Sequence, residues 1–398
     1  MSKLEELIEQ YCPDGVEYYK IKDVYKRIKG TPITAGKMKE IATPDGSVRI
    51  FAGGKTVIDA NEKDIPNANI TRVPAVLIQS RGVIDAVYYD KPFTFKNEMW
   101  AYTTFNQKSV KYLYYILKSN IQTFRDAASG MGALPQISLG VTEEFEIPVP
   151  PLPVQEEIVR ILDTFTELQA ELQAELQKRK QQYNYYRDNL LTNFTTEQNV
   201  KEYTLGELGT FTRGNGLQKK DFTKEGIGCI HYGQIYTRFG AFADKTLTYV
   251  NRELASHLLQ VEKGNLVIAC TSENVEDICK SVAWLGEENI CTGGHACVFR
   301  HNQNPKYISY FFQTEYFFNQ KKKYTYGTKV KDIKPDSIAK IKIPLPSLKE
   351  QERIVSILDN LYTLTTDLTQ GLPAEIEKRR QQYEYYRDKL LTFKRKGA

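Results

Sequence analysis

Apolar side chains recur at steps of three or four residues through the middle of the chain, and polar residues fill most of the positions between them. They comprise Ile158, Ile161, Phe165, Leu168, Leu172, Leu176, Arg179, Tyr183, Tyr186 and Leu190, with Arg179 as the one charged member. Such spacing is typical of a coiled-coil seam and places these residues on one helical face. The pattern predicts one helix from Val154 to Phe194, about 60 Å long.

A second apolar stripe near the C-terminus predicts another long helical segment, from Leu348 to Phe393. Its apolar positions are Ile354, Ile357, Leu358, Leu361, Leu364 and Leu368. Gly371 is expected to end one helix there, and Pro373 to begin the next. Because neither stripe can be buried alone, we expect the two segments to pair as an antiparallel coiled coil.

The remaining pattern is mixed and predicts two α/β domains, so that the fold class is α+β. The expected elements are helices at 3–11, Val110–Phe124 and Lys306–Lys322 and strands at Ala75–Gln79, Val83–Tyr89, Asn265–Ala269 and Cys297–Arg300. The proline-rich segment Pro148–Pro153 is expected to be a stiff connector before the first long helix. Thr195–Asn199 is expected to be a polar linker.

The chain contains an internal duplication. KRKQQYNYYRDNLLT from Lys178 and KRRQQYEYYRDKLLT from Lys378 share 12 of 15 positions. Upstream, IPVPPLPVQEEIVRILD from Ile147 and IPLPSLKEQERIVSILD from Ile343 share 11 of 17. YKIKDVYKRIKG from Tyr19 and YTLGELGTFTRG from Tyr203 also match in pattern. Repeats of this kind decide the architecture, here two matched halves produced by duplication.

This organisation predicts five segments. They are an N-terminal helical arm (1–15), a first α/β domain (16–147), a central helix (148–194), a second α/β domain (195–343) and a C-terminal helix (344–398).

Length, composition and charge limit the classes of protein to which the chain could belong. A chain of 398 residues suits two to three domains, and its net charge of +5 permits a polyanionic partner without requiring one. No apolar run resembles a signal peptide or a membrane span, and the six unevenly spaced cysteines are typical of reduced thiols. We therefore expect a cytoplasmic protein with no membrane partner.

Basic loops at matching places in the two domains are candidates for DNA binding. Lysine and arginine suit phosphates, whereas neighbouring Thr, Ser, Asn, Gln, His and Tyr suit base edges. His231-Tyr232-Gly233-Gln234 and Thr292-Gly293-Gly294-His295 could equally be satisfied core groups. The candidates are Lys26, Arg27, Lys29, Thr31, Lys37, Lys39, Ser80, Arg81, Arg213, Asn215, Gln218, Lys219, Lys220, His231, Tyr232, Gln234, Ser272, Asn274, His295, Lys329 and Lys331.

The sequence lacks the spacing or the residues of the known catalytic and metal-binding motifs. Cys279, Cys291, His295 and Cys297 lack the usual cysteine spacing of a zinc site. Gly54-Lys55-Thr56 lacks the first glycine of a phosphate-binding loop, and we find neither an amino-methyltransferase motif nor a nuclease carboxylate cluster. The sequence predicts a binding protein with no catalytic or metal site.

The repeated tyrosine-rich blocks are candidates for subunit interfaces, because tyrosine combines a large apolar area with a polar end. The residues concerned are Tyr183, Tyr185, Tyr186, Arg187, Tyr383, Tyr385, Tyr386 and Arg387. The alternative is coiled-coil core with a solvated surface. Glu167–Gln177 reads ELQAELQAELQ, a four-residue repeat that could set helix length, since each unit adds about 6 Å and turns the face by only about 40°.

The order of domains and helices, with PLPVQEEIVRILD and QQYNYYRDNLLT bounding the first helix and matching blocks bounding the second, resembles the specificity subunit of type I restriction-modification systems. The resemblance covers the whole chain. It implies two target recognition domains, related by a pseudo-twofold axis, that each bind one half of a bipartite, asymmetric site in double-stranded DNA and are held apart by the helices.

The resemblance also implies the partners. Modification subunits would dock on the helices and methylate adenine with S-adenosylmethionine, and a restriction subunit would translocate and cleave DNA with ATP and Mg. None of these cofactors would bind this chain.

Two other classes remain open from the residues alone. A stand-alone nuclease or methyltransferase would need the motifs that are missing. A coiled-coil adapter between proteins would show no DNA selectivity, and the basic loops argue against it.

Overall fold

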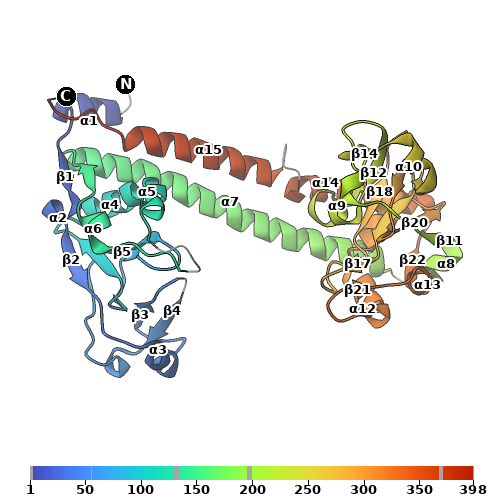
Figure 1. Ribbon diagram of the computed structural model, residues 1–398, viewed down its shortest axis with the longest axis horizontal. Coiled ribbons are helices and arrows are strands. Elements are labelled where there is room, and N and C mark those ends of the chain that lie inside the picture. The colour runs from blue at the N-terminus through green and yellow to red at the C-terminus, as the bar shows by residue number, and fades with distance from the viewer. Residues whose placement is uncertain (1–2, 55, 130–133, 195–199, 367–370, 398) are drawn as a thin grey trace. The chain divides into compact units, whose positions relative to one another are not determined.

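The structure is a computed structural model that describes residues 3–54, 56–129, 134–194, 200–366 and 371–397. Its contacts divide the chain into two units (Figure 1). Unit 1 comprises Met1–Leu172 and Ile376–Ala398, and unit 2 comprises Gln173–Glu375. Each unit therefore combines one mixed domain with parts of the long helices.

The first long helix is continuous, as predicted. Helix α7 (Leu152–Thr192) begins two residues before the expected Val154 and ends two before Phe194. Its start lies inside the segment expected to be a connector, because a proline at position 153 falls in the first turn, where amides have no intrahelical partner.

The second long segment is interrupted, also as predicted, and forms α14 (Leu348–Thr366) and α15 (Leu372–Leu390). The Gly371 carbonyl accepts hydrogen bonds from the amides of Ala374 and Glu375, so Gly371 lies at the start of α15. Its expected role at the end of the preceding helix depends on residues 367–370, which lie outside the described residues. Leu368 and the linker Thr195–Asn199 lie outside the described residues.

Unit 1 contains a four-stranded antiparallel sheet in the order β2-β8-β5-β6 and a three-stranded sheet in the order β4-β3-β7. The strands are β2 (Lys26–Lys29), β3 (Val48–Phe51), β4 (Val57–Ala60), β5 (Ala75–Gln79), β6 (Asp85–Tyr89), β7 (Phe93–Phe95) and β8 (Trp100–Thr103), with a separate pair of β1 (Tyr18–Lys20) and β9 (Glu146–Pro148). The helices are α1 (Lys3–Tyr11), α2 (Ile21–Val24), α3 (Ala35–Ile41), α4 (Gln107–Ser119), α5 (Ile121–Asp126) and α6 (Leu139–Glu143).

Unit 2 contains sheets in the orders β11-β20-β16-β18-β13 and β14-β12-β19-β15. Their strands are β11 (Gly209–Arg213), β12 (Ile227–Ile230), β13 (Phe242–Ala243), β14 (Thr248–Val250), β15 (Leu259–Val261), β16 (Leu266–Ala269), β18 (Ser281–Trp284), β19 (Ile290–Thr292) and β20 (Ala296–His301). Two further pairs join β10 (Lys201–Thr204) to β22 (Lys342–Leu345) and β17 (Thr271–Ser272) to β21 (Lys331–Asp332). The helices are α8 (Leu205–Leu208), α9 (Tyr232–Thr237), α10 (Arg252–His257), α11 (Pro305–Phe311), α12 (Glu315–Tyr324) and α13 (Pro335–Ile338).

The two domains share one topology. The order β2-β8-β5-β6 corresponds to β11-β20-β16-β18, and β4-β3-β7 corresponds to β14-β12-β19, with the parallel pairing of β3 to β7 repeated by β12 and β19. The duplication seen in the helical blocks therefore extends through the domains, although their sequences diverge after the first twelve residues.

Two expected helices are each divided in the structure. The helix expected at Val110–Phe124 breaks at Asn120, whose side chain donates to the Ile116 carbonyl at the end of α4. The helix expected at Lys306–Lys322 breaks before α12, where the Thr314 hydroxyl caps the Phe317 amide. Short polar side chains that satisfy end groups compete with continued helix at such points.

The long helices pack in opposite directions. In unit 1, Phe165 of α7 stacks on Tyr386 of α15, with ring centroids 5.6 Å apart. In unit 2, Tyr183 of α7 contacts Tyr362 of α14 at 6.0 Å. Later positions of α7 therefore meet earlier positions of the C-terminal segment, as the antiparallel prediction requires.

Each domain is anchored by one tyrosine-rich block from the helix that follows the other domain. Tyr183 and Leu191 lie in the core of unit 2. Leu391 lies in the core of unit 1, and Tyr383 packs against it. In unit 1 the chain ends also meet, because the Val16 amide donates to the Lys394 carbonyl and the Lys396 amide to the Val16 carbonyl (Figure 1).

Candidate nucleic-acid interface

Strand ends gather several of the predicted DNA-binding residues at one edge of the unit 1 sheets. Lys29 is the last residue of β2, and Ser80 and Arg81 follow β5. Lys29 faces Trp100, the first residue of β8, and Trp100 also pairs with β5 at Ile78. The loops after β2 and β5 and before β8 therefore meet at this edge.

Two of these predicted residues are buried and organise the loops. Thr31 is fully buried; its hydroxyl lies 2.7 Å from that of Thr94 and accepts a hydrogen bond from the Asn69 amide. Ser80 is also fully buried and donates its hydroxyl to the Glu98 carbonyl. Neither side chain is available to a ligand in this conformation.

The basic residues of unit 1 are dispersed. Lys29 and Arg81 are exposed at the edge, whereas Lys26 lies at the opposite end of β2, opposite Thr103. Arg27 lies 3.6 Å from the Glu143 carboxylate. Lys37 and Lys39 belong to α3, where Lys37 pairs with Glu40 at 2.7 Å. The structure brings only part of the predicted cationic set together.

The equivalent edge of unit 2 has Arg213, the last residue of β11, at its centre. The Arg213 guanidinium makes two hydrogen bonds to the Asp332 carboxylate, at 3.0 and 2.7 Å, and donates a third to the Gly294 carbonyl at 3.1 Å. Burial alone would raise the pKa of Asp332, but hydrogen bonds from Arg213 and Tyr326 hold it below its ordinary value. Arg213 therefore joins β11, β21 and the 293–295 loop.

His231, Tyr232 and His295 form an aromatic cluster at this edge. The ring centroids of His231 and Tyr232 are 4.5 Å apart, and those of Tyr232 and His295 are 4.7 Å apart. The Thr271 hydroxyl lies 3.0 Å from His295 Nδ1 and orients the exposed imidazole. His231 caps α9 by accepting from the Gly233 amide, and burial, with the nearby Lys219 and His295, lowers the pKa of its imidazole.

The other predicted residues of unit 2 differ in exposure and in contacts. Gln234 contacts the Thr248 hydroxyl, and the Asn274 amide donates to Asp277. Lys331 donates to the Gly327 carbonyl, and Ser272 is partly buried opposite Lys331 in the β17–β21 pair. Asn215, Gln218, Lys219, Lys220 and Lys329 are exposed.

Three consecutive lysines, Lys321–Lys323, form a run in the last turn of α12, and one of them is buried. Lys321 is only 4% exposed and donates to the carbonyls of Glu276 and Ile278. Burial lowers the pKa of this ammonium group. Among the lysines of this run, Lys321 therefore stabilises the domain and is inaccessible to DNA.

Sequence reasoning missed Glu98, Thr271 and Asp332 at these edges. Asp332 and Glu98 are acidic, so positive charge does not identify them, and no sequence pattern distinguishes Thr271 from the predicted Ser272 beside it. The signal that could have found them is the equivalence of the two domains, which becomes visible only with strand register.

All six cysteines are free and buried. Within the ranges described, no group of three or more His, Cys, Asp or Glu side chains could hold a metal ion.

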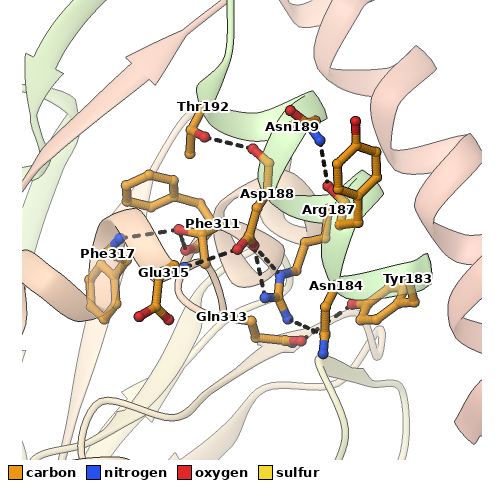
Figure 2. A network of polar contacts seen from close by, with 12 residues as sticks. Tyr183, Asn184, Arg187, Asp188, Asn189, Thr192, Phe311, Gln313, Glu315 and Phe317 are labelled. Carbon is orange, nitrogen blue, oxygen red and sulfur yellow. Dashed lines mark hydrogen bonds and ion pairs between the residues drawn. The ribbon is translucent and has the colours of Figure 1, made fainter. Parts of the chain in front are cut away.

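The tyrosine-rich block of α7 has a buried and an exposed face. Figure 2 shows Tyr183 directed toward Gln313, and Arg187 hydrogen-bonded to Asp188. Asp188 in turn accepts from the Glu315 amide at the start of α12. Tyr183 is 6% exposed, whereas Tyr185 is 66% exposed.

The block of α15 repeats this arrangement in unit 1. Asp388 accepts from the Ser119 hydroxyl, and Arg387 lies over the Tyr383 ring. Tyr385 is 64% exposed, and Tyr386 and its counterpart Tyr186 are also exposed. A role of these blocks in subunit contacts stays a prediction, with Tyr185, Tyr186, Tyr385 and Tyr386 as its accessible members.

Among the described helices, none is long and apolar enough to span a membrane.

Comparison with known proteins gives a consistent assignment. The chain matches the type I restriction modification DNA specificity domain twice, over residues 13–179 and 197–378. It is 34% identical over 295 residues to the type I restriction enzyme EcoR124I/EcoR124II specificity subunit of Escherichia coli, an alignment that covers 72% of each chain. It is 23% identical to a putative type I specificity subunit, S.MpnORF507P, of Mycoplasma pneumoniae over 95% of this chain and 98% of that one.

The fold agrees with these sequence matches. The crystal structure of the type I restriction-modification S subunit from M. genitalium aligns with a TM-score of 0.54 at 17% identity and covers 94% of this chain and 95% of that one. The chain belongs to the family of type I restriction-modification specificity subunits.

Proposed function

We propose that this chain recognises a bipartite, asymmetric site in double-stranded DNA, with each domain binding one half. The observation that carries the proposal is that two domains of one topology present different side chains at equivalent edges. Arg81 is exposed two residues after β5, whereas Thr271, at the same place after the equivalent strand β16, is buried. Two domains that share a topology but differ in the side chains at this edge can bind two half-sites of different sequence.

The chemistry of the edges supports DNA as the ligand. Lys29 and Arg81 in unit 1, and Lys219 and Lys220 in unit 2, are exposed cations that can neutralise phosphates. Exposed Asn215, Gln218 and His295 offer donors and acceptors to base edges. Phosphate contacts would position the duplex, and the polar side chains would supply discrimination.

Helices α7, α14 and α15 would set the separation of the two half-sites. A DNA site must match both half-sites at one fixed spacing. Two domains that each have modest sequence specificity therefore give high specificity together. The exposed tyrosines of α7 and α15 would receive the modification subunits, one near each domain.

The chemistry would reside in the partners. Modification subunits would supply S-adenosylmethionine and transfer its methyl group to adenine, and a restriction subunit would use ATP and Mg. Methylation requires extrusion of the base from the duplex, and firm binding of the flanking bases by this chain would reduce the cost of that extrusion.

The test is single-molecule methylation mapping of DNA from a methylation-free host that expresses this chain with the modification subunit encoded beside it. We expect a two-part motif with a fixed gap that disappears when this chain is omitted. A stable complex without any motif would overturn the proposal and support a protein adapter. Methylation by this chain alone would contradict the assignment of catalysis to the partners.

A further inference from the structure

Strand register identifies one position that the two domains share. In unit 1, Trp100 opens β8 and faces both Lys29, the last residue of β2, and Ile78 of β5. In unit 2, Cys297 faces both Arg213, the last residue of β11, and Ile268 of β16. Trp100 and Cys297 are therefore equivalent, and so are the residues two places before them, Glu98 and His295.

The backbone carbonyl at this position accepts a hydrogen bond in both domains, from a side-chain hydroxyl in unit 1 and from a backbone amide in unit 2. The Glu98 carbonyl accepts from the Ser80 hydroxyl, and the His295 carbonyl accepts from the Cys270 amide. Ser80 and Cys270 each lie two residues after the equivalent positions Ile78 and Ile268. The fold thus presents one anchored position with a different side chain in each domain.

The two side chains are accessible and oriented. The Glu98 side chain is 27% exposed, pairs with Lys96 at 2.9 Å and lines a cavity of 540 Å³ together with Lys29 and Asn97. His295 is exposed and oriented through Nδ1 by Thr271, so a ligand would meet Nε2. Each is a fixed polar group at the edge proposed to face DNA.

A carboxylate at this edge is informative because it cannot serve phosphate binding. Phosphate oxygens repel a carboxylate, whereas the cations Lys29 and Arg81 beside the same loops attract the phosphate backbone of DNA. An acidic side chain is favourable in a groove where it accepts a hydrogen bond, and the cytosine N4 amino group is the donor that Glu and Asp contact.

We propose that this shared position reads a base in each domain, with the Glu98 carboxylate accepting from the N4 amino group of a cytosine in the half-site of the first domain. His295 takes the corresponding place toward the other half-site. The inference rests on the proposed function. The competing explanation is that Glu98 only neutralises Lys96, in which case its loss would weaken all sequences equally.

The experiment compares methylation motifs from wild-type complex with those of Glu98→Gln and His295→Ala. Glu98→Gln keeps the size of the side chain but replaces one carboxylate oxygen with an amide donor and removes the negative charge that strengthens the hydrogen bond from the N4 amino group. We expect the requirement for cytosine at one position of one half-site to weaken, so that discrimination against the other bases at that position falls roughly ten- to a hundred-fold. His295→Ala should alter the other half only, which makes each variant a control for the other.

Glu62→Gln provides a matched control, because Glu62 also pairs with a cation, Arg72, in the same unit, and neither residue lines the cavity at the edge. It should leave the motif unchanged. An unchanged motif in Glu98→Gln, or a change in both halves, would overturn the inference while leaving the proposed function in place. A wild-type complex with no motif would instead remove the proposed function.

A second measurement does not depend on how the variants fold. Wild-type complex would be titrated with duplexes in which each cytosine of the half-site is replaced by an analogue without the N4 amino group. We expect one replacement to weaken binding ten- to a hundred-fold. Equal affinity for all of the replaced duplexes would contradict the inference.

Discussion

The Tyr115 hydroxyl of α4 donates a hydrogen bond to the Asp163 carboxylate of α7, which also pairs with Lys111 at 2.7 Å. In unit 2, Tyr310 and Lys306 make the same contacts to Asp359. Each domain is thus fastened to the helix that follows it by an identical, partly buried cluster.

Removing either carboxylate should loosen the corresponding domain. Asp163→Asn or Asp359→Asn replaces charged hydrogen bonds with weaker ones, so we expect each to cost about 1.5 to 3 kcal/mol of the free energy of unfolding. Hydrogen exchange should show the loss in α4 for the first variant and in α11 for the second. As a control, Glu287→Gln breaks an exposed pair with Lys263 and should change stability by less than about 1 kcal/mol. Equal losses in all three variants would contradict this explanation.

Glu157 of α7 should contribute acid-sensitive stability to unit 1. It is 4% exposed, and hydrogen bonds from Arg160 and Lys3 lower its pKa to about 2. Because the folded-state pKa lies below the ordinary value of 4.5, the contribution is present above about pH 5 and is lost as the pH falls toward 2.

Urea unfolding of Glu157→Gln across this range measures the effect. The variant should be less stable at pH 7 by about 1 to 2 kcal/mol, a figure reduced because both cations are exposed and screened by solvent. The difference from wild type should shrink as the pH falls. Glu156→Gln, at the neighbouring exposed position, should show no such trend. A constant difference at every pH would rule out the linkage.

The two faces of the tyrosine-rich blocks should separate folding from partner binding. Tyr183→Ala removes a buried ring from the core of unit 2 and should cost about 3 to 5 kcal/mol. The double variant Tyr185→Ala and Tyr385→Ala removes exposed rings and should change stability by about 0.5 kcal/mol or less.

The same double variant should weaken copurification with the modification subunit, by about 30-fold in affinity if these tyrosines are central to the interface. Unchanged affinity together with unchanged stability would leave the exposed rings as solvated surface.

The four-residue repeat in α7 should set the gap between half-sites. Deleting Glu171–Ala174 removes about 6 Å of helix and turns the following face by only about 40°, which preserves the seam approximately. We expect the gap in the methylation motif to shorten by about one to two base pairs, since a base pair occupies about 3.4 Å. Glu171→Ala changes the same segment without its length and should leave the gap unchanged. An unaltered gap after the deletion would show that the repeat does not set the distance between half-sites.

Only part of the candidate site could be predicted from the sequence, because the sequence does not show which polar side chains are buried. The sequence shows where lysines occur, but it does not distinguish an exposed lysine such as Lys329 from Lys321, whose ammonium group is buried against carbonyl oxygens. Thr31 and Ser80 have polar side chains yet satisfy buried partners. Burial depends on segments distant in the chain.

The sequence by itself determined the long helices, the break near Gly371 and the duplication. These features are local, because a seam of three- and four-residue steps and a repeated block need no knowledge of distant residues. The tertiary structure decided which tyrosine block enters which domain and placed Glu98 and His295 at one shared position. The first depends on contacts between residues more than a hundred positions apart, and the second depends on β-ladder register. Short-range patterns specify neither.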